Sequence, residues 1–279
     1  MTIENNVLCK VTNKDISLDG TFIFPDRITE IGNGAFKYIT RLVKTIIPNT
    51  VKTIKNEAFS HCTNLSDIVI PNSVTTIGEF AFYDCKNLKK VKMSKSLISI
   101  GNDAFSHCES LTEIKLPQTL ISIGKAAFYF CEKLTKINIP KTITTIKSHT
   151  FYSCESLKNI AIPDGVTSIG DFAFLDCRNL SEITLPSSIT TIGMYAFWNC
   201  KKVKEIIFPS SIMSIGAAAF NGCDLLEKII FPDTIQHIGA NAFAHCSSIE
   251  EIIVPKHTIS TKKNLTKEKI QKIINGKPI

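Results

Sequence analysis

Residues 70–88 read IPNSVTTIGEFAFYDCKNL, and the pattern of this stretch recurs along the chain at one fixed interval. Its second phenylalanine marks the interval without one slip of register, at Phe36, Phe59, Phe82, Phe105, Phe128, Phe151, Phe174, Phe197, Phe220 and Phe243. A strict period without insertions is typical of stacked coils, each of which buries its apolar face only against its neighbours. The sequence therefore predicts a repeat solenoid of ten 23-residue repeats.

The apolar spacing within one repeat predicts its strands. Residues 65–70 alternate in the manner of a short strand whose Ile68 and Ile70 face inward, so strands of successive coils should pair in parallel. Pro71 ends this strand, because proline has no N–H to donate to a sheet. The chain then turns back into the core at Val74, where a second short strand can form.

The rest of the repeat contains a glycine column and the main core residue. The column of Gly78 holds glycine in eight repeats and lysine in two, which favours a left-handed backbone position. Ala81, Phe82 and Cys85 then follow at helical spacing, so we expect one helical or 3-10 turn on the outer side. A fold of this kind is α/β to mainly β in class.

The ends of the chain differ from its middle, as the capping of a solenoid requires. Residues 1–23 lack the repeat pattern and are interpreted as an irregular extended N-terminal cap. Residues 24–259 form the solenoid. Residues 260–279 predict a basic capping helix that Gly276 can end. A free helix that binds a partner is the alternative interpretation of this segment.

The net charge of +7 is concentrated at the C-terminus, since residues 256–279 carry seven lysines and one glutamate. The remainder of the chain is therefore close to neutral. A nucleic-acid-binding protein needs a concentrated basic footprint, so we expect no nucleic acid partner. A lysine-rich terminal helix is more often a solvated face than a binding element.

Nine of the ten cysteines share one column of the repeat, and Ile39 fills that column in the first repeat. A position that accepts isoleucine is a buried apolar position, so these thiols are interpreted as small core residues. Free buried thiols imply a reducing compartment. Disulfides between neighbouring repeats are the alternative, because stacking brings the thiols close to one another.

Sequence motifs of catalysis and metal binding are missing. The six histidines are scattered over different columns, and no G-x-S-x-G, P-loop, H-E-x-x-H or C-x-x-C motif is present. We therefore expect no enzymatic activity, no cofactor and no metal site. The first six residues have neither a basic start nor an apolar core, so we expect no signal peptide, and no apolar run is long enough to span a membrane.

Aromatic side chains gather in two columns, one before the repeat's alanine and one after its phenylalanine. Positions three apart share one face of a helical turn. The predicted ridge consists of Tyr129, Tyr152, Phe172, Tyr195 and Trp198, with Phe130 and Leu175 beside them. Aromatic residues are frequent in binding hot spots. The alternative is that these large side chains pack between coils and stay half-buried.

A second candidate surface is the outward column of the predicted strands. This column reads Ile46, Val69, Lys92, Lys115, Asn138, Ala161, Thr184, Ile207, Ile230 and Ile253. Its last three residues predict an apolar groove, flanked by the acidic residues Glu182, Glu205, Glu227, Glu250 and Glu251. A basic patch at the other end consists of Lys89, Lys90, Lys92, Lys115 and Lys136. The groove suits a basic, partly hydrophobic protein segment, and β-propensity alone is the alternative explanation of its isoleucines.

The repeat unit L-x-x-I-x-I-P-x-S-V-T-x-I-G-x-x-A-F-x-x-C-x-x-L resembles the BspA-like (treponemal-type) leucine-rich repeat over residues 24–259. The resemblance implies a curved, right-handed solenoid with a parallel sheet on its inner side. It also implies a binding protein, often a surface adhesin of bacteria and protists and sometimes a protein that acts inside a host cell. Three positions depart from the pattern: Thr45 replaces an inward isoleucine, Ser94 the proline and Thr150 the alanine.

The sequence thus predicts a non-enzymatic scaffold for protein–protein interaction that presents rigid, pre-ordered columns. We expect it in the cytoplasm, or in a host cytoplasm into which it is delivered as an effector. A secreted or surface adhesin that binds host or matrix ligands is the alternative, and a module of a larger catalytic protein is a third. The sequence does not predict an oligomeric state.

Overall fold

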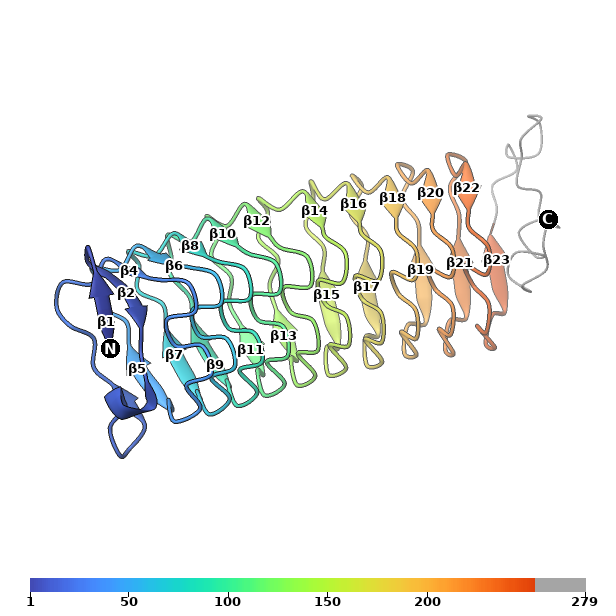
Figure 1. The fold of residues 1–279 in the computed structure, drawn as a ribbon. Coiled ribbons are helices and arrows are strands. Elements are labelled where there is room, and N and C mark those ends of the chain that lie inside the picture. Colours follow the sequence, from blue (N-terminus) through green and yellow to red (C-terminus); the bar gives the residue numbers. More distant parts are fainter. Residues whose placement is uncertain (254–279) are drawn as a thin grey trace. The chain divides into compact units, whose positions relative to one another are not determined.

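The computed structural model of the chain describes residues 1–253 (Figure 1). The capping helix expected at residues 260–279 lies outside this described part. The chain divides into two compact units, one ending at Thr142 and the other beginning at Ile143, and each is described by itself. Both units are β-solenoids of coils about 23 residues long, which confirms the predicted fold class.

Each unit of the solenoid contains two kinds of parallel sheet, which we call the front sheet and the back sheet. In the first unit the front sheet consists of β3 (Thr21–Phe22), β5 (Lys44–Ile46), β7 (Asp67–Val69), β9 (Lys90–Lys92), β11 (Glu113–Ile114) and β13 (Lys136–Ile137). The back sheet consists of β1 (Thr2–Glu4), β2 (Val7–Lys10), β4 (Glu30–Ile31), β6 (Thr53–Ile54), β8 (Thr76–Ile77), β10 (Ser99–Ile100) and β12 (Ser122–Ile123).

The second unit repeats this arrangement. Its front strands are β15 (Asn159–Ala161), β17 (Glu182–Thr184), β19 (Glu205–Ile207), β21 (Lys228–Ile230) and β23 (Glu251–Ile253). Its back sheet consists of β14 (Thr145–Ile146), β16 (Ser168–Ile169), β18 (Thr191–Ile192), β20 (Ser214–Ile215) and β22 (His237–Ile238). Strands of neighbouring coils pair in parallel, and paired residues such as Ile206 and Ile229 hold the same position in successive repeats. The predicted strands and their register are therefore confirmed.

The expected helical turn is wrong. Two residues of each repeat adopt positive φ, as Phe80 (54°) and Asp84 (58°) do, and such residues interrupt a right-handed helix. Every second N–H of this segment then points to the next coil instead of along a helix. The N–H of Phe82, for example, donates to the carbonyl of Ala104 at 2.7 Å. This segment forms the third side of the solenoid. Hydrogen bonds between neighbouring coils hold it, although it contains no strands.

The glycine column has a different role from the one expected. Gly78 and its equivalents lie outside the left-handed region, which the two positions just described occupy instead. A Cβ on Gly124 would lie 2.3 Å from the carbonyl carbon of Gly101 in the preceding coil. Glycine at position 124 therefore allows the close approach of two backbones, whereas Lys55 and Lys147 occupy the same column in other repeats.

The phenylalanine column forms the core, as predicted. All ten of its side chains are fully buried. In the first unit Phe59, Phe82 and Phe105 stack with ring centroids 5.1 Å apart and planes 5° apart. In the second unit Phe174 and Phe197 stack at 5.0 Å. The interior rings of each unit, such as Phe82 and Phe197, are thus covered on both faces by the coils before and after them.

The cysteine column lies beside these rings, and its thiols are free. The thiol of Cys85, for example, donates to the carbonyl of Phe59 at 3.2 Å, and the same contact recurs along the column. Burial raises the pKa of Cys62 to about 12 and that of Cys108 well above its ordinary value. These buried thiols are therefore protonated at neutral pH and poorly nucleophilic.

We expect native protein treated with Ellman's reagent to react at no more than Cys9 and Cys246, which are the two half-buried cysteines. Hydrogen bonding to Cys223 lowers the pKa of Cys246, so Cys246 should react first. All ten thiols should react after denaturation. Native labelling of most of the column, or disulfides between neighbouring coils in a mass spectrum, would contradict the assignment.

Residues 1–23 are extended, as expected, but they are only partly irregular. β2 pairs in parallel with β4, which places Val7 opposite Glu30 and Leu8 opposite Ile31. β1 turns back on β2 as an antiparallel strand and covers this edge of the back sheet. Within the N-terminal segment, β2 therefore adds a strand in the register of the repeats, and β1 closes the edge of the back sheet.

The three departures from the repeat pattern are each compensated by a hydrogen bond. Buried Thr45 donates through its hydroxyl to the carbonyl of Phe22 at 2.9 Å. The hydroxyl of Ser94 accepts from the N–H of Ser96 at 3.1 Å, and Thr150 donates to the carbonyl of Lys147 at 2.7 Å. Buried polar groups need such partners, so these positions are tolerated inside the solenoid.

Candidate binding surfaces

The three isoleucines predicted to line a groove lie side by side on the front sheet of the second unit. The register of β19, β21 and β23 places Ile207 opposite Ile230, and Ile230 opposite Ile253 (Figure 1). Ile207 is 57% exposed, Ile230 is half-buried, and Ile253 is 38% exposed. We call these three residues the C-terminal strip. It is a contiguous apolar surface that the core does not use.

The acidic residues expected beside this strip are partly neutralised. Lys228 lies between two of them, 4.0 Å from Glu205 and 3.1 Å from Glu251. Glu182 is the first residue of β17. Glu182, Glu227 and Glu250 are all exposed, and none of them forms an ion pair within residues 1–253. The surroundings of the strip are therefore acidic, though less strongly than the sequence indicates.

The predicted ridge exists in the second unit, although no helix forms it. Phe172 lies between His149 and Tyr195, with ring centroids 4.8 and 5.0 Å away and nearly parallel planes. Trp198 meets Tyr195 edge-on at 6.1 Å and donates its indole N–H to the side-chain oxygen of Asn221 at 3.2 Å. Residues three apart, such as Tyr195 and Trp198, therefore lie together although no helix is present. A backbone with positive φ at Tyr195 brings their side chains to the same side.

Exposure favours the alternative interpretation of the ridge. Tyr195 is 36% exposed, whereas Tyr152, Phe172 and Trp198 are half-buried and Leu175 is only 2% exposed. Packing between coils therefore accounts for most of the area of these rings. Tyr129 belongs to the first unit and is also half-buried.

The first unit holds a chain of aromatic and imidazole rings that sequence reasoning missed. Tyr38 stacks on His61 at 4.5 Å, and Tyr83 meets both His61 and His107 edge-on, at 5.3 and 5.5 Å. His107 in turn contacts Tyr129 at 5.5 Å. These rings come from two columns, one and two residues after the phenylalanine, so neither column shows the row alone.

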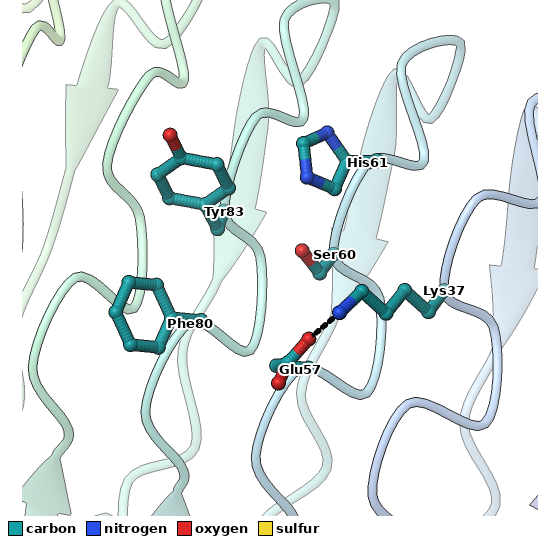
Figure 2. A pocket seen from close by; sticks show the side chains of 6 residues that line it. All are labelled: Lys37, Glu57, Ser60, His61, Phe80 and Tyr83. Carbon is teal, nitrogen blue, oxygen red and sulfur yellow. Dashed lines mark hydrogen bonds and ion pairs between the residues drawn. The ribbon is translucent and has the colours of Figure 1, made fainter.

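An open pocket of about 210 Å³ lies beside the rings of His61 and Tyr83 (Figure 2). It is lined by Lys37, Glu57, Ser60, His61, Phe80 and Tyr83. Lys37 and Glu57 form an ion pair across it, and the hydrogen bond to Glu57 raises the pKa of Lys37. The two charged side chains of Lys37 and Glu57 in the pocket therefore neutralise each other.

Ser60 and His61 of the pocket, together with the neighbouring Asp84, are the residue types of a hydrolytic triad, but they do not have its geometry. His61 Nδ1 lies 2.9 Å from Asp84 Oδ2, which is the contact of an imidazole with an orienting carboxylate. A nucleophile must also hydrogen-bond to the imidazole. The hydroxyl of Ser60 makes no hydrogen bond to His61 in this part of the chain. The arrangement therefore supports ring packing rather than nucleophilic catalysis.

Among residues 1–253, no cluster of three or more histidine, cysteine, aspartate or glutamate side chains could hold a metal ion. In the same range, no helix has the length and apolar character needed to cross a membrane.

A second apolar strip lies at the opposite end of the outward column, in the first unit. Ile23, Ile46 and Val69 are 83%, 81% and 46% exposed. The register of β5 and β7 places Ile46 opposite Val69, and Ile23 directly follows β3, one residue after the pair of Phe22 with Thr45. We call these three residues the N-terminal strip. The signal was available, because Ile23 precedes Ile46 by one period, but the boundary of the cap at residue 23 concealed it.

Comparisons with known proteins agree with this architecture. A family model described as a BspA type leucine rich repeat region (6 copies) matches residues 29–158, 75–203 and 144–273. A leucine-rich repeat protein from Bacteroides ovatus is 32% identical with a TM-score of 0.79, over 84% of this chain and 63% of that protein. The chain therefore spans less than two thirds of that relative's length.

A leucine rich cell surface protein from Faecalibacterium prausnitzii is also similar. It is 26% identical with a TM-score of 0.53, and the match covers 93% of this chain and 83% of that protein. The search of curated proteins found no match. The similarities thus extend over most of the solenoid.

Proposed function

The chain belongs to the BspA-type leucine-rich repeat family, and from this we propose that it is a non-enzymatic scaffold that binds a protein partner on its front sheet. The C-terminal strip is the observation that carries the proposal. Three isoleucines in register keep apolar area in water that the core does not need, and water disfavours such area. A partner that covers the strip removes this area from water.

The surroundings of the strip indicate the chemistry of that partner. Glu182, Glu227 and Glu250 are exposed and form no ion pair within residues 1–253. Such charges orient a partner and speed its association more than they add affinity. A protein segment that is basic and partly hydrophobic therefore fits this surface best. The rigid sheet costs little conformational entropy on binding, because its strands are already ordered.

We expect the triple variant Ile207→Ser/Ile230→Ser/Ile253→Ser to fold and to lose the partner. These side chains point away from the core, so the melting temperature should stay close to that of the wild type. The measurement is a pull-down from cytosolic extract with wild-type and variant proteins side by side. The partner band should disappear with the variant.

The matched control is Trp198→Ala, because Trp198 is the largest side chain of the competing ridge. This variant should keep the partner, since Trp198 is half-buried between coils. If the triple variant binds normally and Trp198→Ala does not, the ridge is the binding surface and the proposal for the front sheet is wrong.

The ten free cysteines support a reducing compartment, such as the cytoplasm or a host cytoplasm. The second candidate is a surface adhesin, which the similarity to a cell surface protein favours. The thiol state of protein isolated from its native source separates the two. Thiols that are free throughout the column support the cytoplasmic role, and disulfides between coils support export.

A further inference from the structure

The outward column of the first unit changes character after the N-terminal strip. Ile23, Ile46 and Val69 are followed by Lys92 and Lys115, one residue from each successive coil. The register of β9 with β7 places Lys92 opposite Val69, and Lys115 directly follows β11, one residue after the pair of Ile114 with Val91. The strands that carry these residues are neighbours in the sheet (Figure 1). A single line across the front sheet is therefore apolar over three coils and basic over the next two.

The two lysines are not compensated by the protein itself. Lys92 and Lys115 are exposed and form no ion pair within residues 1–253, and like charges directly opposite each other destabilise a sheet. Lys89 is also exposed and unpaired in this range. By contrast, Lys44 beside the apolar end is paired with Asp19 at 3.3 Å. The excess positive charge therefore lies at one end of the line only.

The neighbouring column does not remove this excess. It reads Thr21, Lys44, Asp67, Lys90 and Glu113 over the same coils, so its signs alternate and its charges cancel. The apolar residues of the line keep apolar area in water, and its two lysines carry like charges on neighbouring coils. Both costs decrease when a ligand that is apolar at one end and acidic at the other covers the line.

We propose that this line binds an acidic amphipathic helix of a protein partner. The apolar side chains of the helix cover the N-terminal strip, and its carboxylates pair with Lys92 and Lys115. This site lies in a different unit from the C-terminal strip and takes a ligand of opposite charge. It therefore goes beyond the function proposed above and does not depend on it.

The spacing of the line favours a helix. Neighbouring strands lie about 4.8 Å apart, and one helical turn advances about 5.4 Å. Successive turns of a helix can therefore face successive coils, with one side chain at every third or fourth position. An extended segment presents side chains of one face about 6.7 Å apart and falls out of step within the five coils.

The test uses the full-length protein and a fluorescein-labelled helical peptide of about 15 residues. The peptide carries leucine on three successive turns and glutamate on the next two. We expect saturable binding by fluorescence anisotropy. Its dissociation constant should rise about tenfold or more between low and high salt, because salt screens the exposed lysines. A peptide with lysine in place of glutamate should not bind.

Two double variants test the two halves of the line. Lys92→Glu/Lys115→Glu should weaken binding about tenfold or more and remove the salt dependence. Ile23→Ser/Ile46→Ser should weaken binding about tenfold while the salt dependence remains. Both variants should melt as the wild type does, since all four side chains are exposed.

Matched controls carry the same substitutions on other faces. Ile98→Ser/Ile121→Ser removes two isoleucines that are 44% and 61% exposed near the back sheet. Lys52→Glu/Lys125→Glu reverses two exposed lysines that have no ion pair within residues 1–253. Neither control should change the affinity by more than about twofold. Ile207→Ser/Ile230→Ser/Ile253→Ser should also bind the peptide normally, which separates this site from the proposed function.

Several results would overturn the proposal. It is wrong if the acidic peptide does not bind at about millimolar concentration, a very weak affinity. It is also wrong if the controls weaken binding as much as the test variants do. Vesicles of phosphatidylserine and phosphatidylcholine are the remaining comparison. Vesicle binding that needs Lys92, Lys115 and the strip, and that excludes the peptide, would assign the line to an anionic membrane instead.

Discussion

Phe82→Ala should lower the free energy of unfolding of the first unit by about 4 kcal/mol. Phe82 is fully buried, and its ring stacks on Phe59 and Phe105, both 5.1 Å away. The substitution removes buried apolar area and leaves a cavity that two flat neighbours cannot close by small movements. Urea unfolding followed by circular dichroism measures the loss.

Tyr83→Ala is the matched control, one residue further along the chain. Tyr83 is half-buried at the open pocket, so its loss should cost about 1 kcal/mol. Because solenoids can unfold in blocks, hydrogen exchange should show the largest change for Phe82→Ala in the coils of Phe59 to Phe105. Equal losses for the two variants would refute the inward assignment of the phenylalanine column.

Gly124→Ala should be nearly as damaging, at about 3 kcal/mol, although it adds only one methyl group. The new Cβ would lie 2.3 Å from the carbonyl carbon and oxygen of Gly101 and 2.4 Å from the N atom of Asn102. These are backbone atoms of residues tied to the coil before them, since the Gly101 N–H donates to the Ile77 carbonyl and the Asn102 carbonyl accepts from the Phe80 N–H. They therefore cannot move aside separately. A thermal melt of the purified variant checks the result.

Gly34→Ala separates close approach from backbone strain. Gly34 has a φ of 61°, but its Cβ would meet nothing nearer than 3.6 Å, and Glu57 and Phe80 occupy the same position in the next two coils. The expected loss is about 1 kcal/mol, the cost of a left-handed residue. If Gly34→Ala lowers the stability as much as Gly124→Ala does, close approach of the backbones is not the reason for glycine at position 124.

The strict period of the sequence was sufficient to predict the parallel strands, the buried phenylalanines and the free thiols. Each of these depends on one position recurring in register, which a sequence displays directly. The adjacency of Ile207, Ile230 and Ile253 follows for the same reason. Whether they bind a partner is a property of that partner, and the period contains no information about it.

The third side of the solenoid was missed because its signal lies in residue types and not in spacing. One of the left-handed columns contains mainly residues that favour positive φ: His61, Asp84, His107, Asp176, Asn199, Gly222 and His245. The helical spacing of Ala81 and Cys85 predicts a helical turn, whereas this composition favours the interrupted backbone that the structure has. The pairing of Glu205 and Glu251 with Lys228 was missed because it joins different coils through side-chain conformation.

The identical register of every coil has a consequence for the gene. Loss of the DNA that encodes one whole repeat would join Ala81 to Phe105 as it is now joined to Phe82, and duplication of that DNA would preserve the same junction. Each column would remain continuous, with one coil fewer or more. Unequal recombination between the similar copies can therefore change the length of the solenoid in whole coils, and move surface residues between neighbours, without disturbing the core.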